Sequence, residues 1–159
     1  MSKKNMFELL REKSIFAMLD GDTEFGEIES DEPRGNITVS MPYLSGPDLC
    51  SISKRFGLPV TYGSQSRWGY LDDIWAHCIK NHRESDLLSF LFSKEQFAEK
   101  LKGYSKETVE GVYAKIVEST IKQINGALYF GGNELVHISN QFVIRKIGST
   151  VTVVAPTIK

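Results

Sequence analysis

The sequence predicts an α+β fold in which a helical middle section precedes a C-terminal antiparallel β-meander packed on a long helix. Apolar residues recur every three to four positions through the middle of the chain, which is typical of amphipathic helices. Near the C-terminus, β-branched runs are separated by turns as short as Ser139-Asn140, which favours antiparallel pairing of successive strands. Helices and strands in separate blocks indicate the α+β class.

Length and composition indicate one ordinary globular domain. The chain has 159 residues, of which 41% are hydrophobic and 25% charged, so a disordered or fibrous protein is excluded. We expect a single domain over 1–159, with 1–40 as a partly mobile N-terminal appendage. Because 19 Lys and Arg face 20 Asp and Glu, no strong overall field attracts nucleic acid or membranes, although a local basic patch is compatible with this balance.

The cysteines and the N-terminus favour the cytoplasm. Cys50 and Cys78 form neither a CxxC pair nor a disulfide framework, which suits a reducing compartment. Charged residues interrupt the first apolar stretch, so no signal peptide is expected. The longest uninterrupted apolar run, 15–19, is far shorter than the ~20 residues needed to cross a bilayer. We therefore expect a cytoplasmic protein without a membrane partner.

The first part of the chain alternates between helical and extended signals. Apolar spacing predicts a helix over 5–19, although its compact apolar end also permits a strand. The acidic stretch 21–35 should be a solvated connection or an exposed hairpin. A strand is expected over 37–41, and a short helix over 45–56 with proline in its first turn.

Four further helices are predicted from their caps and apolar faces. One begins at Ser66 and ends near residue 82, a second is capped by Ser85, and a third begins with a capping box at Ser93. The longest covers 105–125 and should end at Asn125-Gly126. The meander is expected to contain four strands, over 127–130, 134–138, 141–147 and 150–154.

The loop before the Ser66 helix is a candidate anion site. Ser64, Ser66 and Arg67, with Trp68 beside them, lead into a helix N-terminus, where backbone N–H groups and a guanidinium can hold a phosphate. This arrangement suggests a nucleotide or nucleic-acid binding module as one alternative function. The other interpretation is structural, with Ser66 as the cap and the Arg67 stem packed over Trp68. No Walker or GxGxxG pattern occurs.

A second alternative is a small metal-dependent enzyme. Asp73 and His77 are four residues apart, as are Cys78 and His82, so either pair could share a helix face. Neither pair completes a ligand set, and the structural interpretation places Cys78 in the core with the histidines at the wet edge of the helix. We accordingly predict neither a metal nor another cofactor.

Catalytic signatures are missing from the sequence, whereas candidate contact residues are present. No GxSxG or HExxH motif occurs, so the chain is predicted not to be an enzyme. Aromatic residues gather in the middle third, and most of them should belong to the core. One or two of them, if exposed beside Arg55 and Arg67, would form a contact patch for a protein or nucleic-acid partner. They are Tyr43, Tyr62, Trp68, Tyr70 and Trp75.

Three segments, 41–49, 66–72 and 124–136, carry a family resemblance that continues into the closing residues 155–159. They resemble the N-terminal region of AbiJ-type abortive-infection proteins of bacteria. The resemblance implies a non-catalytic sensing or regulatory domain in phage defence, followed by a helical HEPN-like effector domain that cuts RNA or is otherwise toxic. The chain stops before such a domain and lacks its Arg-x4-6-His motif.

The resemblance also implies the partners. The first is the C-terminal effector domain of the same protein, so the chain is expected to be the N-terminal part of a longer one. A phage protein, a host protein or an RNA would act as the trigger, and assembly into a homo-oligomer is left open.

Overall fold

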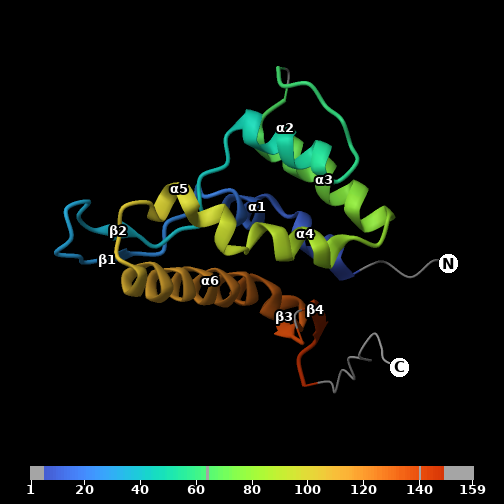
Figure 1. Ribbon diagram of the computed structural model, residues 1–159. Coiled ribbons are helices and arrows are strands. Elements are labelled where there is room, and N and C mark those ends of the chain that lie inside the picture. The colour runs from blue at the N-terminus through green and yellow to red at the C-terminus, as the bar shows by residue number, and fades with distance from the viewer. Residues whose placement is uncertain (1–5, 64, 140, 149–159) are drawn as a thin grey trace.

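The predicted α+β class is confirmed by a computed structural model that describes residues 6–63, 65–139 and 141–148. Figure 1 shows helices α2 (Gly46–Arg55) and α3 (Arg67–Lys80) on one side and the long helix α6 (Lys106–Leu128) on the other. Helices α1 (Lys13–Leu19) and α4 (Glu84–Leu91) lie between them. None of the described helices is long and apolar enough to cross a membrane.

The core lies where these helices meet. Many of its members come from α1, α3, α4 and α6 and are almost inaccessible to solvent. Burying each large apolar side chain contributes roughly 1.5–3 kcal/mol. They include Phe16, Tyr70, Leu71, Ile74, Trp75, Leu87, Leu88, Ile116 and Ile124.

The N-terminal helix is interrupted. A 3₁₀ helix, η1 (Met6–Arg11), precedes α1, and Glu12 between them has extended backbone angles. The alternative strand interpretation of residues 15–19 is wrong, because all five lie within α1. Leu10 and Leu19 are fully buried, which argues against a separate appendage over the described residues from 6 to 40.

The acidic stretch forms the exposed hairpin that was one of its two predicted forms. Strand β1 (Glu27–Ile28) pairs antiparallel with β2 (Ile37–Thr38). The predicted strand over 37–41 is therefore shorter than expected, and beyond it Val39 continues the pairing through bonds to Phe25 and Gly26.

The helix starts were predicted correctly where a side-chain cap forms. In α2 the Ser45 hydroxyl accepts from Asp48 N–H, and the Asp48 carboxylate accepts from Ser45 N–H. At α3 the Ser66 hydroxyl accepts from Gly69 N–H. The cap of α2 consists of two hydrogen bonds and that of α3 of one, and both satisfy helix N–H groups that have no partner within the helix.

Two predicted caps are wrong because the hydroxyls bond elsewhere. Ser85 donates to Phe142 O of the C-terminal hairpin at 2.9 Å, and α4 begins before it. Ser93 donates to Phe90 O, and the helix predicted to begin at Ser93 is split into η2 (Lys94–Phe97) and α5 (Ala98–Leu101).

Helix α6 continues past its predicted end, so the expected strand over 127–130 is wrong. That segment completes α6 and forms η3 (Tyr129–Gly131). Asn125 is helical because its amide is used elsewhere: Nδ2 donates to Leu135 O at 2.9 Å, and Leu135 N–H donates to Oδ1 at 2.5 Å. The side chain that suggested a turn instead joins the helix to a strand.

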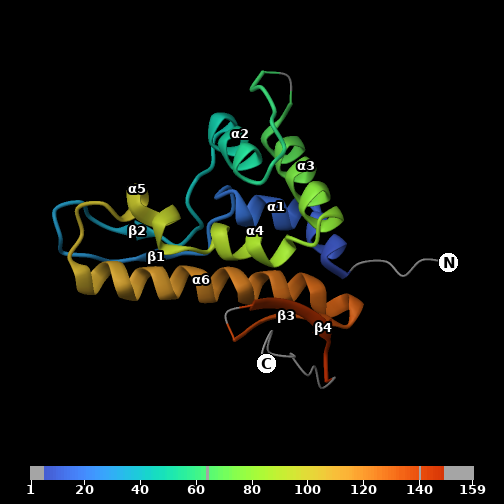
Figure 2. The same ribbon diagram turned by 45° about the vertical axis from the view of Figure 1, so that its right-hand side comes forward.

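The C-terminal hairpin packs on α6, as Figure 2 shows. Strand β3 (Asn133–Ile138) pairs antiparallel with β4 (Gln141–Lys146), and Leu135 lies opposite Ile144 in the register. Both side chains are buried. Two strands of the predicted meander are thus present, and the one expected over 150–154 lies outside the described residues.

Candidate functional site

Helices α2 and α3 lie side by side and run parallel. Near their starts Arg67 Nε donates to Leu44 O at 2.6 Å, and near their ends His77 Nε2 lies 2.9 Å from Phe56 O. The two N-terminal ends therefore share one edge of the molecule and the two C-terminal ends share the opposite edge.

Arg67 ties the N-terminal edge together. Its Nη1 donates to Asp22 Oδ1 at 2.6 Å and its Nη2 donates to Asp20 O at 2.7 Å. The Asp20 carboxylate, with its side chain only 3% exposed, lies 3.6 Å from Nη2. Burial raises the pKa of Asp20, and the nearby guanidinium opposes that rise.

Above this network, Tyr43 is exposed yet held in place. The Arg67 guanidinium carbon lies 4.0 Å from the centre of the Tyr43 ring, a cation–π contact. The ring is nevertheless 63% exposed. Because three backbone or carboxylate acceptors fix Arg67, the ring rests on a rigid support.

The predicted anion site has its polar groups engaged within the protein. The Ser66 hydroxyl caps α3, and all three nitrogens of the Arg67 guanidinium face acceptors of the chain itself. The Arg67 guanidinium lies over the Tyr43 ring, whereas the Trp68 ring, 43% exposed, lies 4.7 Å from Lys13 Nζ. Ser64 lies outside the described residues. An anion at this loop would compete with Asp22 for the guanidinium.

The candidate metal ligands do not converge. Asp73 accepts from Gln65 Nε2 at 3.1 Å, His77 faces Phe56 O, and His82 is exposed in a left-handed backbone conformation. Among the described residues, no group of three or more His, Cys, Asp and Glu is placed to hold a metal ion. Cys78 is fully buried as predicted, and desolvation raises its pKa to about 11, which keeps the thiol protonated.

The aromatic residues of the middle third divide between core and surface. Tyr70 and Trp75 are buried, whereas Tyr43, Tyr62 and Trp68 are exposed, so the expectation that most of the five rings belong to the core is wrong. The Tyr62 ring stacks on Tyr70 at 6.1 Å and covers Gly46, where a Cβ would lie only 2.0 Å from Tyr62 Cε1. We call the three exposed rings the aromatic patch. The aromatic patch surrounds the N-terminal ends of α2 and α3. The sequence indicated that these aromatic residues are grouped, but not which of their rings are exposed.

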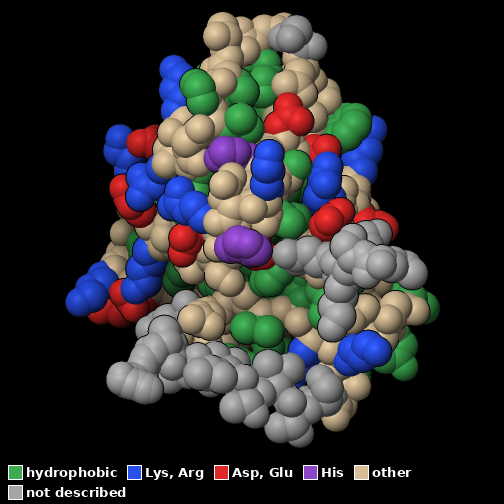
Figure 3. All heavy atoms as spheres, turned by 90° about the vertical axis from the view of Figure 1, so that its right-hand side faces the viewer, with side chains coloured by type: hydrophobic (Ala, Val, Ile, Leu, Met, Phe, Trp, Pro, Cys, Tyr) green, Lys and Arg blue, Asp and Glu red, His purple; other side chains and the backbone are tan. Residues whose placement is uncertain are grey.

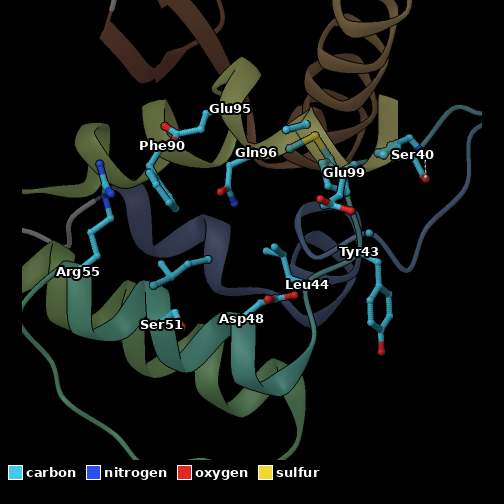
Figure 4. A pocket seen from close by; sticks show the side chains of 16 residues that line it. Ser40, Tyr43, Leu44, Asp48, Ser51, Arg55, Phe90, Glu95, Gln96 and Glu99 are labelled. Atoms are coloured by element: carbon cyan, nitrogen blue, oxygen red, sulfur yellow. Dashed lines mark hydrogen bonds between the residues drawn. The ribbon is translucent and has the colours of Figure 1, made fainter. Parts of the chain in front are cut away.

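A groove adjoins the patch, and Tyr43 stands at its rim (Figure 4). The groove has a volume of about 680 Å³ and lies between α2 and the η2–α5 segment, with residues 40–44 along one side. Asp48 lines one wall, Glu95 and Glu99 the other, and Arg55 with Phe90 lies at one end. Apolar groups such as Met41 and Leu44 also line it.

Lys100 closes part of the groove near Ser40. Its Nζ donates to Ser40 Oγ at 3.2 Å, and burial lowers the pKa of the ammonium group. Acidic walls beside apolar lining suit a polypeptide segment that carries a cationic side chain next to an apolar one.

No protein-family model matches the chain, and no curated protein or solved structure matches it either.

Proposed function

We propose that this chain is a non-catalytic recognition domain that binds a polypeptide segment in the groove, with Tyr43 as the anchor. The observation that carries the proposal is the exposed Tyr43 ring supported by the fixed Arg67 guanidinium. Tyrosine is among the residues that dominate binding energy at interfaces. Because the ring is already immobilised, binding costs little further side-chain entropy.

The charges of the groove specify the chemistry of the partner. Glu95 and Glu99 are exposed and make no ion pair within the described part of the chain, and Asp48 faces them from α2. Two cations also line the groove, Arg55 at one end and Lys100, whose Nζ is bonded to Ser40 Oγ. Because the three carboxylates outnumber them, the groove favours a partner segment with Lys or Arg. An apolar side chain beside that cation would contact Phe90 and Ala98, which line the groove and are not buried.

The biological setting of the proposal comes from the resemblance of 41–49, 66–72 and 124–136 to AbiJ-type proteins. On that basis the domain is the sensing or regulatory half of a cytoplasmic phage-defence protein in bacteria. The segment that it binds belongs to a helical HEPN-like effector domain of the same protein, which the domain controls until a phage protein, a host protein or an RNA acts as trigger.

Peptide selection tests the binding surface. From a displayed library of random peptides of about 12 residues, the purified protein should enrich sequences with Lys or Arg beside an apolar residue. Tyr43→Ala should weaken the selected peptides at least about tenfold, since truncating a hot spot costs more than ~1.4 kcal/mol. Binding would be measured by fluorescence anisotropy with labelled peptides.

Tyr129→Ala provides the matched control. Tyr129 is 65% exposed, close to the value for Tyr43, but it follows α6 far from the groove. Its loss should leave peptide binding unchanged, whereas Glu95→Gln with Glu99→Gln should selectively weaken the basic peptides. No enrichment, or equal losses in the two tyrosine variants, would show that the groove is not the binding surface.

The genomic reading frame tests the phage-defence setting separately. We expect the frame to continue past Lys159 into a helical domain that contains an Arg-x4-6-His motif. A frame that ends without such a domain would contradict the regulatory identity while leaving the peptide measurements unaffected.

A further inference from the structure

The C-terminal ends of α2 and α3 carry a cluster of cations at the edge opposite Tyr43. Figure 3 shows Lys and Arg side chains on both sides of the histidines on this face. Its members, which we call the basic face, are Lys54, Arg55, Lys80 and Arg83. Only Arg83 has an ion pair among the described residues, to Asp86 at 3.3 Å. Asp and Glu side chains also lie among the Lys and Arg side chains on this face in Figure 3, so the basic face is defined by four cations at the ends of two helices.

Two of the cations are held on aromatic rings. Arg55 lies 4.4 Å from the centre of the Phe90 ring, and Arg83 lies 4.7 Å from that of Phe56. The two rings contact each other edge to face at 5.9 Å. A connected pair of phenylalanines therefore supports two guanidinium groups, one on each ring.

Cations are favoured near helix C-termini, but capping does not account for this cluster. The carbonyls at these ends already have other partners: Phe56 O faces His77 Nε2, and His77 O accepts from Asn81 Nδ2 at 2.8 Å. Lys54 and Lys80 are exposed and make no hydrogen bond to these carbonyls. Their charges remain available to a ligand.

We propose that the basic face binds the phosphodiester backbone of single-stranded nucleic acid. Ring-supported guanidiniums offer N–H groups to phosphate oxygens and a flat face on which a base can stack. Lys54 and Lys80 add flexible charges beside them. A membrane is disfavoured because the exposed aromatic patch, which could insert into lipid, lies at the opposite edge.

The binding test uses fluorescein-labelled oligouridylate and oligothymidylate, each of about 12 nucleotides, with anisotropy read at roughly 50 mM and 200 mM salt. Both probes should bind saturably and more weakly at the higher salt concentration. Lys54→Gln combined with Lys80→Gln should weaken binding about tenfold. It should also reduce the slope of log K against log salt by about 1.4, since each phosphate contact with a single strand contributes ~0.7. Arg55 belongs both to the basic face and to the groove lining, whereas neither lysine lines the groove, so this double variant tests nucleic-acid binding apart from peptide binding.

Lys106→Gln combined with Lys122→Gln is the charge-matched control. Both lysines are exposed on α6, on the far side of the molecule, and their loss should leave nucleic-acid binding unchanged. Equal binding of the two probes supports backbone recognition, and preference for the RNA supports it with an added 2′-hydroxyl contact.

Three results would overturn the proposal: no saturable binding at the lower salt concentration, equal losses in the two double variants, or displacement of the probe by a polyglutamate peptide at the same concentration as by unlabelled oligonucleotide. The last result would assign the face to an acidic protein partner.

Discussion

Replacing Arg67 with alanine is expected to destabilise the protein by about 3–5 kcal/mol, the usual cost of removing one member of a buried ion pair. The Asp20 side chain is 3% exposed, and the Arg67 guanidinium is the cation nearest to it. Without that guanidinium the carboxylate is left buried and uncompensated, and Leu44 O loses a hydrogen bond of 2.6 Å. Urea unfolding at about pH 7 measures the loss.

The deficit of Arg67→Ala should shrink as the pH falls. Burial already raises the pKa of Asp20, and removing the positive charge raises it further. A carboxyl whose pKa is raised in the folded state binds its proton more tightly in the folded than in the unfolded state. Lowering the pH therefore stabilises the folded state relative to the unfolded one. Below the folded pKa the carboxyl is neutral and the electrostatic part of the deficit disappears.

Asp20→Asn is the control for this explanation. In the Arg67→Ala background it should restore part of the free energy of unfolding at about pH 7. At about pH 4 it should change that free energy little, because the Asp20 carboxyl is already protonated there. The asparagine oxygen can still accept from Asp22 N–H, as the carboxylate does at 3.1 Å. A deficit that is the same at both pH values would instead attribute the loss to the hydrogen bonds alone.

Local signals in the sequence predicted those parts of the fold that local bonds determine. The starts of α2 and α3 could be read directly, because each capping hydroxyl and the N–H that it accepts from lie within one helical turn. The register of the C-terminal hairpin was similarly accessible, since its two strands are joined by a short turn. In each case the competing structure would leave N–H or C=O groups unsatisfied.

Tertiary contacts overrode local preference elsewhere. Asn125 and Ser85 are typical of a turn and a cap, but their side chains bond to strands ten and 57 residues away. The candidate site was largely beyond prediction for the same reason. Arg67 finds its acceptors 23 to 47 residues earlier in the chain, and the groove brings together residues from several separate segments.

Gly21→Ala should reduce stability by about 3 kcal/mol or more, because it combines backbone strain with a steric clash. Gly21 has a φ of +91°, in the left-handed region that L-residues avoid. A Cβ there would lie 2.6 Å from Pro42 O and 2.7 Å from Tyr43 Cα. These are backbone atoms, so the segment that carries Tyr43 would have to move.

Gly35→Ala separates the two effects, because Gly35 has a φ of +81° and a Cβ there would meet nothing within 4 Å. It should cost only the backbone strain, roughly 1–2 kcal/mol, and leave peptide binding intact. Gly21→Ala should both lower the urea midpoint further and weaken the selected peptides, since Tyr43 and the groove wall shift together. If the two substitutions destabilise the protein equally, the turn after α1 must adjust to the added Cβ without moving Tyr43. The contact between Gly21 and the backbone of Pro42 and Tyr43 would then not help to fix the position of Tyr43.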